Sequence, residues 1–192
     1  MGLGNPGPEY ENTRHNIGFT VLDYLLRKLK KEEVSFKNDP PLFAYTAEPS
    51  IKGRRVLLVK PQTFMNNSGK SVKALINRKI LTDPEDLLVV HDDLDLALGK
   101  MKFVRRAGSG GHRGVESIIN HIGHNRFNRL RLGIGRPAAT YQVESFVLSP
   151  FSDEEAVIVK QLIQTASEAI ICCLTQGIGR AMNIYHSPHK KA

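Results

Sequence analysis

Residues 87–93 read Leu-Leu-Val-Val-His-Asp-Asp, and this stretch decides which type of fold the chain can adopt. Its four consecutive apolar residues, 87–90, predict a buried strand of the kind found in sheets that helices cover on each side. The polar residues His91, Asp92 and Asp93 follow where that strand ends. Crevices of α/β sheets lie outside the carboxyl ends of their strands, so this end is where we expect a site.

Further strands and helices alternate on both sides of this stretch. Strands are predicted at 43–46, 55–60, 100–104 and 129–134. Helical spacing of apolar residues predicts one helix around Leu22, Leu25, Leu26 and Leu29 (with Arg27, Lys28, Lys30 and Lys31 on its solvent side), one at 67–78, one around Val115, Ile118, Ile119 and Ile122, and one opened by a Ser152–Glu155 capping box and ended by Gly177. The alternation predicts an α/β fold, namely a single three-layer domain spanning 1–192 whose twisted mixed, mostly parallel sheet is flanked by helices.

The composition is that of an ordinary globular protein, with 41% hydrophobic and 24% charged residues among 192. No stretch approaches the roughly 18 uninterrupted apolar residues of a membrane span, and we see no secretory leader pattern. The two cysteines, Cys172 and Cys173, are neighbours within a helical pattern and would point in different directions. We therefore expect no disulfide, a reducing compartment and a cytoplasmic protein.

The positive charge is concentrated in one segment. The chain carries 27 basic and 19 acidic residues, a formal net charge of +8. Between positions 97 and 136 there are nine basic residues and one acid, Glu116, so this window holds the whole surplus. Such a concentration indicates a surface for a polyanion, and the alternative is a solvated basic face without a partner.

A glycine-rich stretch at 2–7, GLGNPG, matches the letters of the dinucleotide fingerprint G-x-G-x-x-G. That motif requires a strand before it and a helix that opens inside it. Here only Met1 precedes it, and Pro6 and Pro8 oppose a helix. A nucleotide-binding oxidoreductase is therefore disfavoured, and the glycines suit a tight turn that fixes the direction of Asn5.

His15 lies just before the first predicted helix, with Asn16 as a plausible N-cap. The positive potential at a helix N-terminus favours neutral imidazole, and a nearby carboxylate would counter that effect and fix the tautomer. Asp92, at the end of the buried strand, is the natural partner. Together His15 and Asp92 would form a base and its orienting group, able to activate water. The alternative is that His15 is a structural histidine.

Asn66 lies where a strand gives way to a helix, and its amide could both donate to and accept from a peptide backbone. Its alternative role is a helix cap. We find no G-x-S-x-G elbow or other nucleophile constellation. Nor do the seven histidines, or the acids at 92–95, have the spacing of a metal site, so no metal and no cofactor is expected.

Taken together, these segments resemble the bacterial peptidyl-tRNA hydrolase family almost from end to end. The resemblance rests on five ordered blocks: 2–19 (GLGNPGPEYENTRHNIGF), 60–69 (KPQTFMNNSG), 90–99 (VHDDLDLALG), 108–118 (GSGGHRGVESI) and 129–137 (RLRLGIGRP). Five blocks in order are specific, whereas one alone would not be.

The resemblance implies a role for each matching residue. His15 matches the family's catalytic histidine, and Asp92 matches the aspartate that orients it. For substrate binding it implies the cleft residues Asn5, Tyr10, Met65, Asn66, His112 and Arg113, and for tRNA phosphate it implies Lys102 and Arg131, to which the basic window adds Arg105 and Arg106. It also implies a monomer that needs no metal or organic cofactor and binds the acceptor stem and 3′ end of peptidyl-tRNA.

The sequence departs from the family at two places. Many relatives have asparagine where this chain has Arg113, and the asparagine's help to the water or oxyanion would then pass to Arg113 or His112. Relatives also begin with a short apolar strand before G-L-G-N, where this chain has only Met1. A shortened first strand would leave neighbouring backbone groups unpaired and lower stability.

The resulting hypothesis is hydrolysis of the ester between a peptide and the 3′-terminal ribose of tRNA, with His15 as general base. Asn5 and Asn66 could distinguish a peptide amide from the charged amine of aminoacyl-tRNA. The main alternative is RNA binding without catalysis, since some plastid relatives are splicing factors. The presence of His15, Asp92, Asn5 and Asn66 together favours the enzyme.

Overall fold

The computed structural model describes residues 1–29, 34–137 and 142–186; Lys30 and Lys31 of the predicted first helix lie outside these ranges. The strands are β1 (Lys37–Asp39), β2 (Ala44–Ala47), β3 (Ser50–Ile51), β4 (Arg54–Arg55), β5 (Leu58–Pro61), β6 (Leu88–Asp93), β7 (Met101–Arg105) and β8 (Asn128–Gly133). The α-helices are α1 (Ile17–Lys28), α2 (Gly69–Asn77), α3 (Arg113–Ile122), α4 (Val143–Val147), α5 (Asp153–Gln176) and α6 (Ile178–Tyr185), and short 3-10 turns include Arg14–Asn16 and Met65–Asn67. The α/β class is confirmed.

The strands form two three-stranded sheets, ordered β1-β2-β5 and β6-β8-β7, and a small β3-β4 hairpin. The prediction of one mostly parallel sheet is wrong. Among the strand pairs of the described ranges, β6 and β8 run parallel, whereas β1-β2, β2-β5, β3-β4 and β7-β8 are antiparallel. Short connections such as the turn between β1 and β2 allow only antiparallel pairing, and β8 inserts between β6 and β7, an order that no local pattern encodes.

The backbone of residues 1–3 lies between the two sheets. Gly2 N donates to Val59 O of β5 at 3.0 Å, and Leu3 N donates to Val90 O of β6 at 2.9 Å. Val90 N returns a bond to Met1 O at 2.8 Å. Residues 1–3 thus bond to a strand on each side and link β5 to β6.

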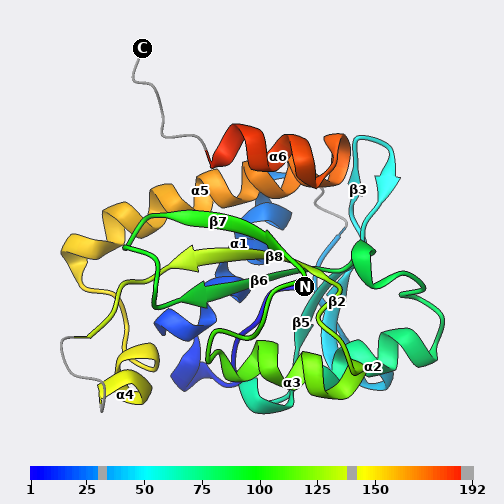
Figure 1. Cartoon of the computed structure of the whole chain (residues 1–192), viewed down its shortest axis with the longest axis horizontal. Coiled ribbons are helices and arrows are strands. Elements are labelled where there is room, and N and C mark those ends of the chain that lie inside the picture. Colours follow the sequence, from blue (N-terminus) through cyan, green and yellow to red (C-terminus); the bar gives the residue numbers. More distant parts are fainter. Residues whose placement is uncertain (30–33, 138–141, 187–192) are drawn as a thin grey trace.

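Helices cover both faces of these strands (Figure 1). One hydrophobic core lies toward α1, α5 and α6 and includes Val90 and Leu130; the other lies toward α2 and α3 and includes Val89 and Val115. Because neighbouring strand residues point to opposite faces, Val89 and Val90 belong to different cores. The prediction that this strand is buried on both sides is confirmed.

Gly18 sets how closely α1 approaches the strands. A Cβ at this position would lie 2.5 Å from Val90 O and 2.6 Å from Leu3 N. The absence of a side chain therefore lets α1 pack directly against β6 and the first residues. This close approach brings the turn that carries His15 to the carboxyl end of β6.

The helix α5 is long and apolar enough to cross a membrane by length and composition, with a mean hydropathy of 1.5 over its best window. Its apolar side, including Leu162 and Ala166, packs in the core with α1, so we regard it as a core helix. The predicted capping box of Ser152 and Glu155 opens it, and Gly177 ends it, as predicted. Cys172 and Cys173 are free thiols, as expected, and burial raises the pKa of Cys173 to about 11.

Other elements differ in detail from the sequence predictions. The segment 55–60 is divided between β4 and β5, because Ser50–Arg55 folds back as a hairpin. Asn66 lies in the turn before α2, and Ser68 takes the N-cap position instead. The short helices α4 and α6 were not predicted, since neither carries more than two turns of periodic residues.

Candidate functional site

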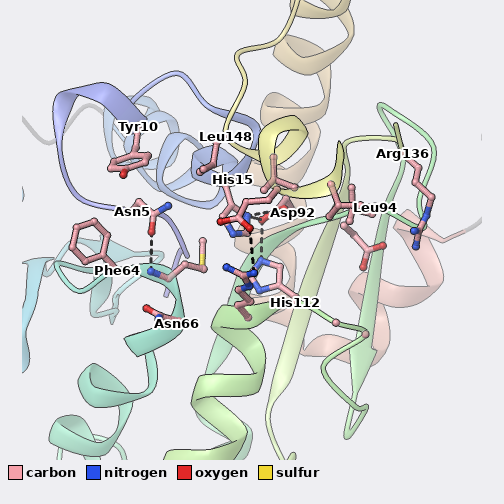
Figure 2. A pocket seen from close by; sticks show the side chains of 18 residues that line it. Asn5, Tyr10, His15, Phe64, Asn66, Asp92, Leu94, His112, Arg136 and Leu148 are labelled. Atoms are coloured by element: carbon pink, nitrogen blue, oxygen red, sulfur yellow. Dashed lines mark hydrogen bonds and ion pairs between the residues drawn. The ribbon is translucent and has the colours of Figure 1, made fainter. Parts of the chain in front are cut away.

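A cleft of about 630 Å³ opens at the carboxyl end of β6. It brings together all eight residues that the sequence placed at the catalytic centre or against the substrate: Asn5, Tyr10, His15, Met65, Asn66, Asp92, His112 and Arg113. Figure 2 shows Tyr10, Phe64 and Asn66 toward one end of the cleft and Leu94 and Arg136 toward the other. His15, Asp92 and His112 lie between these ends, so the cleft has an aromatic end, an end where Arg136 pairs with Asp95, and an ionisable centre.

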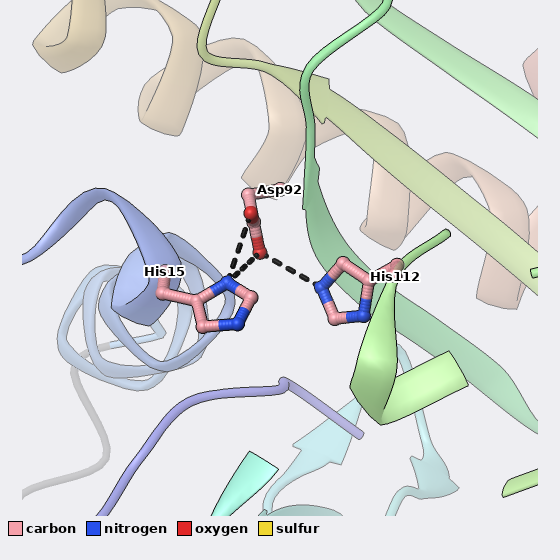
Figure 3. A group of neighbouring side chains, drawn as sticks. All are labelled: His15, Asp92 and His112. Carbon is pink, nitrogen blue, oxygen red and sulfur yellow. Dashed lines mark hydrogen bonds and ion pairs between the residues drawn. The ribbon is translucent and has the colours of Figure 1, made fainter. Parts of the chain in front are cut away.

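The predicted contact between His15 and Asp92 is present at this centre. His15 Nδ1 lies 2.9 Å from both carboxylate oxygens of Asp92 (Figure 3). A carboxylate only accepts, so Nδ1 carries the hydrogen and Nε2 keeps a lone pair. The side chain is largely buried but lines the cleft, and the lone pair is what a general base requires.

The electrostatics of the pair follow from burial and opposite charge. Burial alone would lower the pKa of His15, but the charge of Asp92 and its hydrogen bond outweigh burial and raise that pKa, against a smaller opposing effect of Arg113. Burial alone would raise the pKa of Asp92, but the charges of His15 and His112 and their hydrogen bonds hold it well below its usual range. Asp92 is therefore a carboxylate at any working pH.

His112 contacts the same carboxylate from the opposite side. Its Nε2 lies 2.9 Å from Asp92 Oδ1, and its Nδ1 accepts from the backbone N–H groups of Gly114 at 3.1 Å and Val115 at 3.2 Å. His112 is thus the N-cap of α3. A histidine is not a usual cap residue, so the sequence placed His112 in the cleft but did not predict that it caps α3.

The atoms of His15, Asp92 and His112 lie close enough together to suggest a metal site. The hydrogen bonds argue against this use. Because backbone N–H groups donate to His112 Nδ1, the ring hydrogen sits on Nε2, the atom that would have to ligate a metal with its lone pair. Metal binding there would require breaking the cap of α3, so the three side chains fit a hydrogen-bonded cluster better.

One wall of the cleft is held by hydrogen bonds that involve Asn5. Its Oδ1 accepts from Met65 N at 2.8 Å, which fixes the turn that carries Met65 and Asn66. The side chain of Asn16 is bonded to the backbone of Asn5 rather than capping α1, although Asn16 does take the N-cap position. Asn66 is exposed at the edge of this wall, whereas Met65 is buried.

Side chains that the sequence did not single out complete the cleft. Phe64 is 56% exposed and meets Tyr10 edge to face, with 6.3 Å between ring centroids. Glu144 and Leu148 come from α4 and its end, and Glu144 lies 3.4 Å from the guanidinium of Arg113 across the mouth. In the sequence, only Phe64 could have been noticed, because it stands in the polar stretch 61–66. Glu144 and Leu148 could not, because α4 was not predicted.

The four residues predicted to bind tRNA lie outside this cleft. Lys102 and Arg131 stand directly opposite one another on β7 and β8, and Arg131 is bonded to Asp93. Arg105 and Arg106 share Glu85 as a partner. These acids lie outside the 97–136 window, so the surface is less positive than the sequence count suggested.

Comparison with known proteins shows the family to which the chain belongs. The family model described as "Peptidyl-tRNA hydrolase" matches residues 1–192. The chain is 44% identical over 191 residues to the peptidyl-tRNA hydrolase of Thermodesulfovibrio yellowstonii (97% of each chain) and 47% identical over 178 residues to that of Aquifex aeolicus (93% of this chain, 88% of the relative). The crystal structure of peptidyl-tRNA hydrolase from Acinetobacter baumannii superimposes with a TM-score of 0.86 at 37% identity, covering 95% of this chain and 90% of that one.

Proposed function

The chain belongs to the peptidyl-tRNA hydrolase family and is an ester hydrolase, and we propose that His15 is the base that activates water for its reaction. The observation that carries this proposal is the pairing of His15 Nδ1 with Asp92 inside the cleft, 2.9 Å from each oxygen. It leaves Nε2 as the atom that can take a proton. Base catalysis of this type supplies about 10²–10⁴-fold in rate.

In the proposed reaction, His15 Nε2 removes a proton from water while the water oxygen attacks the ester carbonyl carbon. Asp92 stabilises the imidazolium that forms. Amide donors in the cleft stabilise the oxyanion of the tetrahedral intermediate. The bond to the ribose oxygen then breaks, that oxygen takes the proton from His15, and the products are a free peptide carboxylate and tRNA with its hydroxyl restored.

The two ends of the cleft suggest how the substrate lies. We place the peptide at the end with Tyr10, Phe64 and Asn66, where aromatic faces and an amide suit side chains and backbone. Because Oδ1 of Asn5 is engaged by Met65, its Nδ2 is the atom that can donate to a peptide carbonyl. Met65 shapes this end from a buried position.

The 3′ end of tRNA would enter from the end near Arg136, with the acceptor stem over the basic residues of β7 and β8. Arg113 would contact the substrate at the mouth of the cleft once its ion pair with Glu144 opens. Lys102 and Arg131 point from the same face, and we propose that they, with Arg105 and Arg106, contact phosphates without reading sequence. Both ring nitrogens of His112 are bonded within the protein, so we do not place this side chain against the substrate.

We further propose that the chain works as one domain and as a monomer in the cytoplasm, without a cofactor. The family model spans residues 1–192, which supports a single domain, and the role of this family is the recycling of tRNA in translation.

The test is the release of an N-acetyl-aminoacyl group from tRNA at fixed salt, with tRNA binding measured in parallel. We expect wild type to release it rapidly and His15→Ala to bind tRNA but not release the group. His124→Ala is the matched control, because His124 does not line the cleft, and it should behave as wild type. Binding without release by wild type would instead support the alternative of an RNA-binding protein, and full activity of His15→Ala would refute the assignment of the base.

A further inference from the structure

The carboxylate of Asp92 accepts hydrogen bonds from two imidazoles, those of His15 and His112. The tautomer of the second imidazole is set by its contacts with the backbone. His112 Nδ1 accepts from Gly114 N and Val115 N, so the ring hydrogen must be on Nε2. That Nε2 lies 2.9 Å from Asp92 Oδ1, the oxygen that also lies 2.9 Å from His15 Nδ1 (Figure 3). The N-cap of α3 therefore determines which nitrogen of His112 faces the carboxylate.

His112 is also held from behind. Its side chain is only 8% exposed, and its ring packs edge to face on His91, with 4.6 Å between ring centroids. His91 Nδ1 donates to the backbone carbonyl of Asp92 at 2.6 Å. Burial, together with the neighbouring His112, lowers the pKa of His91 well below its ordinary value. His91 is therefore uncharged, and its ring supports the ring of His112.

We propose that His112 is a positioning residue for the hydrolysis: held as the helix cap of α3, its Nε2–H fixes the carboxylate of Asp92 and shares its negative charge with His15. This inference rests on the proposed role of His15 as base. It replaces substrate binding as the role of His112, because both ring nitrogens are already engaged.

Sharing the carboxylate has a consequence for the base. A carboxylate that accepts from His112 attracts a proton on His15 less strongly than one that accepts from His15 alone. Removing the His112 donor should therefore raise the proton affinity of His15 and keep the base protonated to higher pH. Arg113 at the start of α3 opposes protonation of His15 and pairs with Glu144 of α4. Asp93 and Arg136 also line the cleft, and the charge of Arg129 helps to lower the pKa of His91.

Two substitutions separate the two contacts of His112. His112→Asn places a polar atom near the position of Nδ1, where it can cap α3, but it is too short to reach Asp92. His112→Gln places an amide near the position of Nε2, where it can donate to Asp92, but it lacks the capping atom. The pair thus distinguishes the bond to the active centre from the bond to the helix.

The experiment measures kcat, KM and their pH dependence for wild type and both variants, with the melting temperature of each. We expect His112→Asn to shift the acid limb of kcat/KM upward by on the order of one pH unit and to lower kcat, with KM and melting temperature near wild type. His112→Gln should keep the wild-type pH profile while melting at a lower temperature. NMR long-range ¹H–¹⁵N spectra of wild type should show the Nε2–H tautomer of His112.

A wild-type pH profile for His112→Asn, or a raised KM at unchanged kcat, would overturn the inference and return His112 to structure or substrate binding. An Nδ1–H tautomer in the spectra would overturn it independently of activity. His15→Ala is run alongside: if it stays active, the assignment of the base fails, whereas an inactive His15→Ala with an unshifted His112→Asn profile refutes only the role of His112.

Discussion

Asn16 and Asn5 are joined by two hydrogen bonds: Asn5 N donates to Asn16 Oδ1 at 2.8 Å, and Asn16 Nδ2 donates to Asn5 O at 2.9 Å. Both residues are buried. Since Asn16 follows His15 directly and Asn5 holds the opposite wall through Met65, this pair fixes the width of the cleft.

Asn16→Ala should therefore destabilise the protein and impair catalysis together. It leaves the buried N–H and C=O of Asn5 without partners, at a cost of about 2–6 kcal/mol for the two groups. Urea unfolding and peptidyl-tRNA release measure both effects. Asn77→Ala, at the exposed end of α2, is the control and should change stability by less than about 0.5 kcal/mol. Unchanged activity in Asn16→Ala would show that the pair does not position His15.

The raised pKa of His15 should act on activity and stability in opposite directions. Activity requires the neutral base, so kcat/KM should fall as pH drops through a value above the ordinary 6.5. The stability that the His15–Asp92 pair contributes is fully present below the unfolded pKa and is lost as pH rises through the folded pKa. Urea unfolding of wild type and His15→Asn from pH 5 to pH 9 tests this, and the gap between them should narrow as pH rises. A gap that widens would contradict the sign.

Gly18→Ala should push α1 away from β6. The new methyl group would lie about 2.5 Å from backbone atoms that cannot rotate away. We expect a loss of about 1–3 kcal/mol in the free energy of unfolding and a fall in kcat, because His15 moves with α1. Gly179→Ala in α6 meets no atom within 4 Å and should instead stabilise the helix by about 0.5–1 kcal/mol. Equal behaviour of the two variants would argue that α1 can shift without consequence.

Glu85→Gln should strengthen tRNA binding. The substitution frees Arg105 and Arg106 from their shared acid, so both can neutralise phosphates. The affinity should rise several-fold at low salt, and the slope of log K against log salt should steepen by roughly one per added phosphate contact. Glu168→Gln is the control, because it changes the net charge by the same amount but removes the partner of Lys28 instead. If both variants gain equally, the effect is one of net charge and not of this site.

The position of the site could be predicted from the sequence, whereas most of the hydrogen bonds within it could not. Asp92 was predictable, because polar residues at the end of a buried strand lie where α/β crevices form. The second donor to Asp92 was not, because the capping role of His112 depends on where α3 begins and on which ring nitrogen faces the backbone. Likewise, nothing in the spacing of Asp93 and Arg131 shows that they pair across 38 positions. The order of β6, β8 and β7 also depends on contacts between segments far apart in the sequence. The prediction of a mostly parallel sheet was wrong for that reason.

The link formed by Met1–Leu3 between β5 and β6 also determines how the molecule would respond to force. A pull applied at Met1 would load the bonds to Val59 and Val90, and the load would pass within two residues to Asn5 and the cleft wall. A pull on α6 would first load its packing against β7 and α5, and no residue of α6 lines the cleft. In a stretching experiment the same enzyme should thus lose activity at low force from one attachment point and keep it from the other.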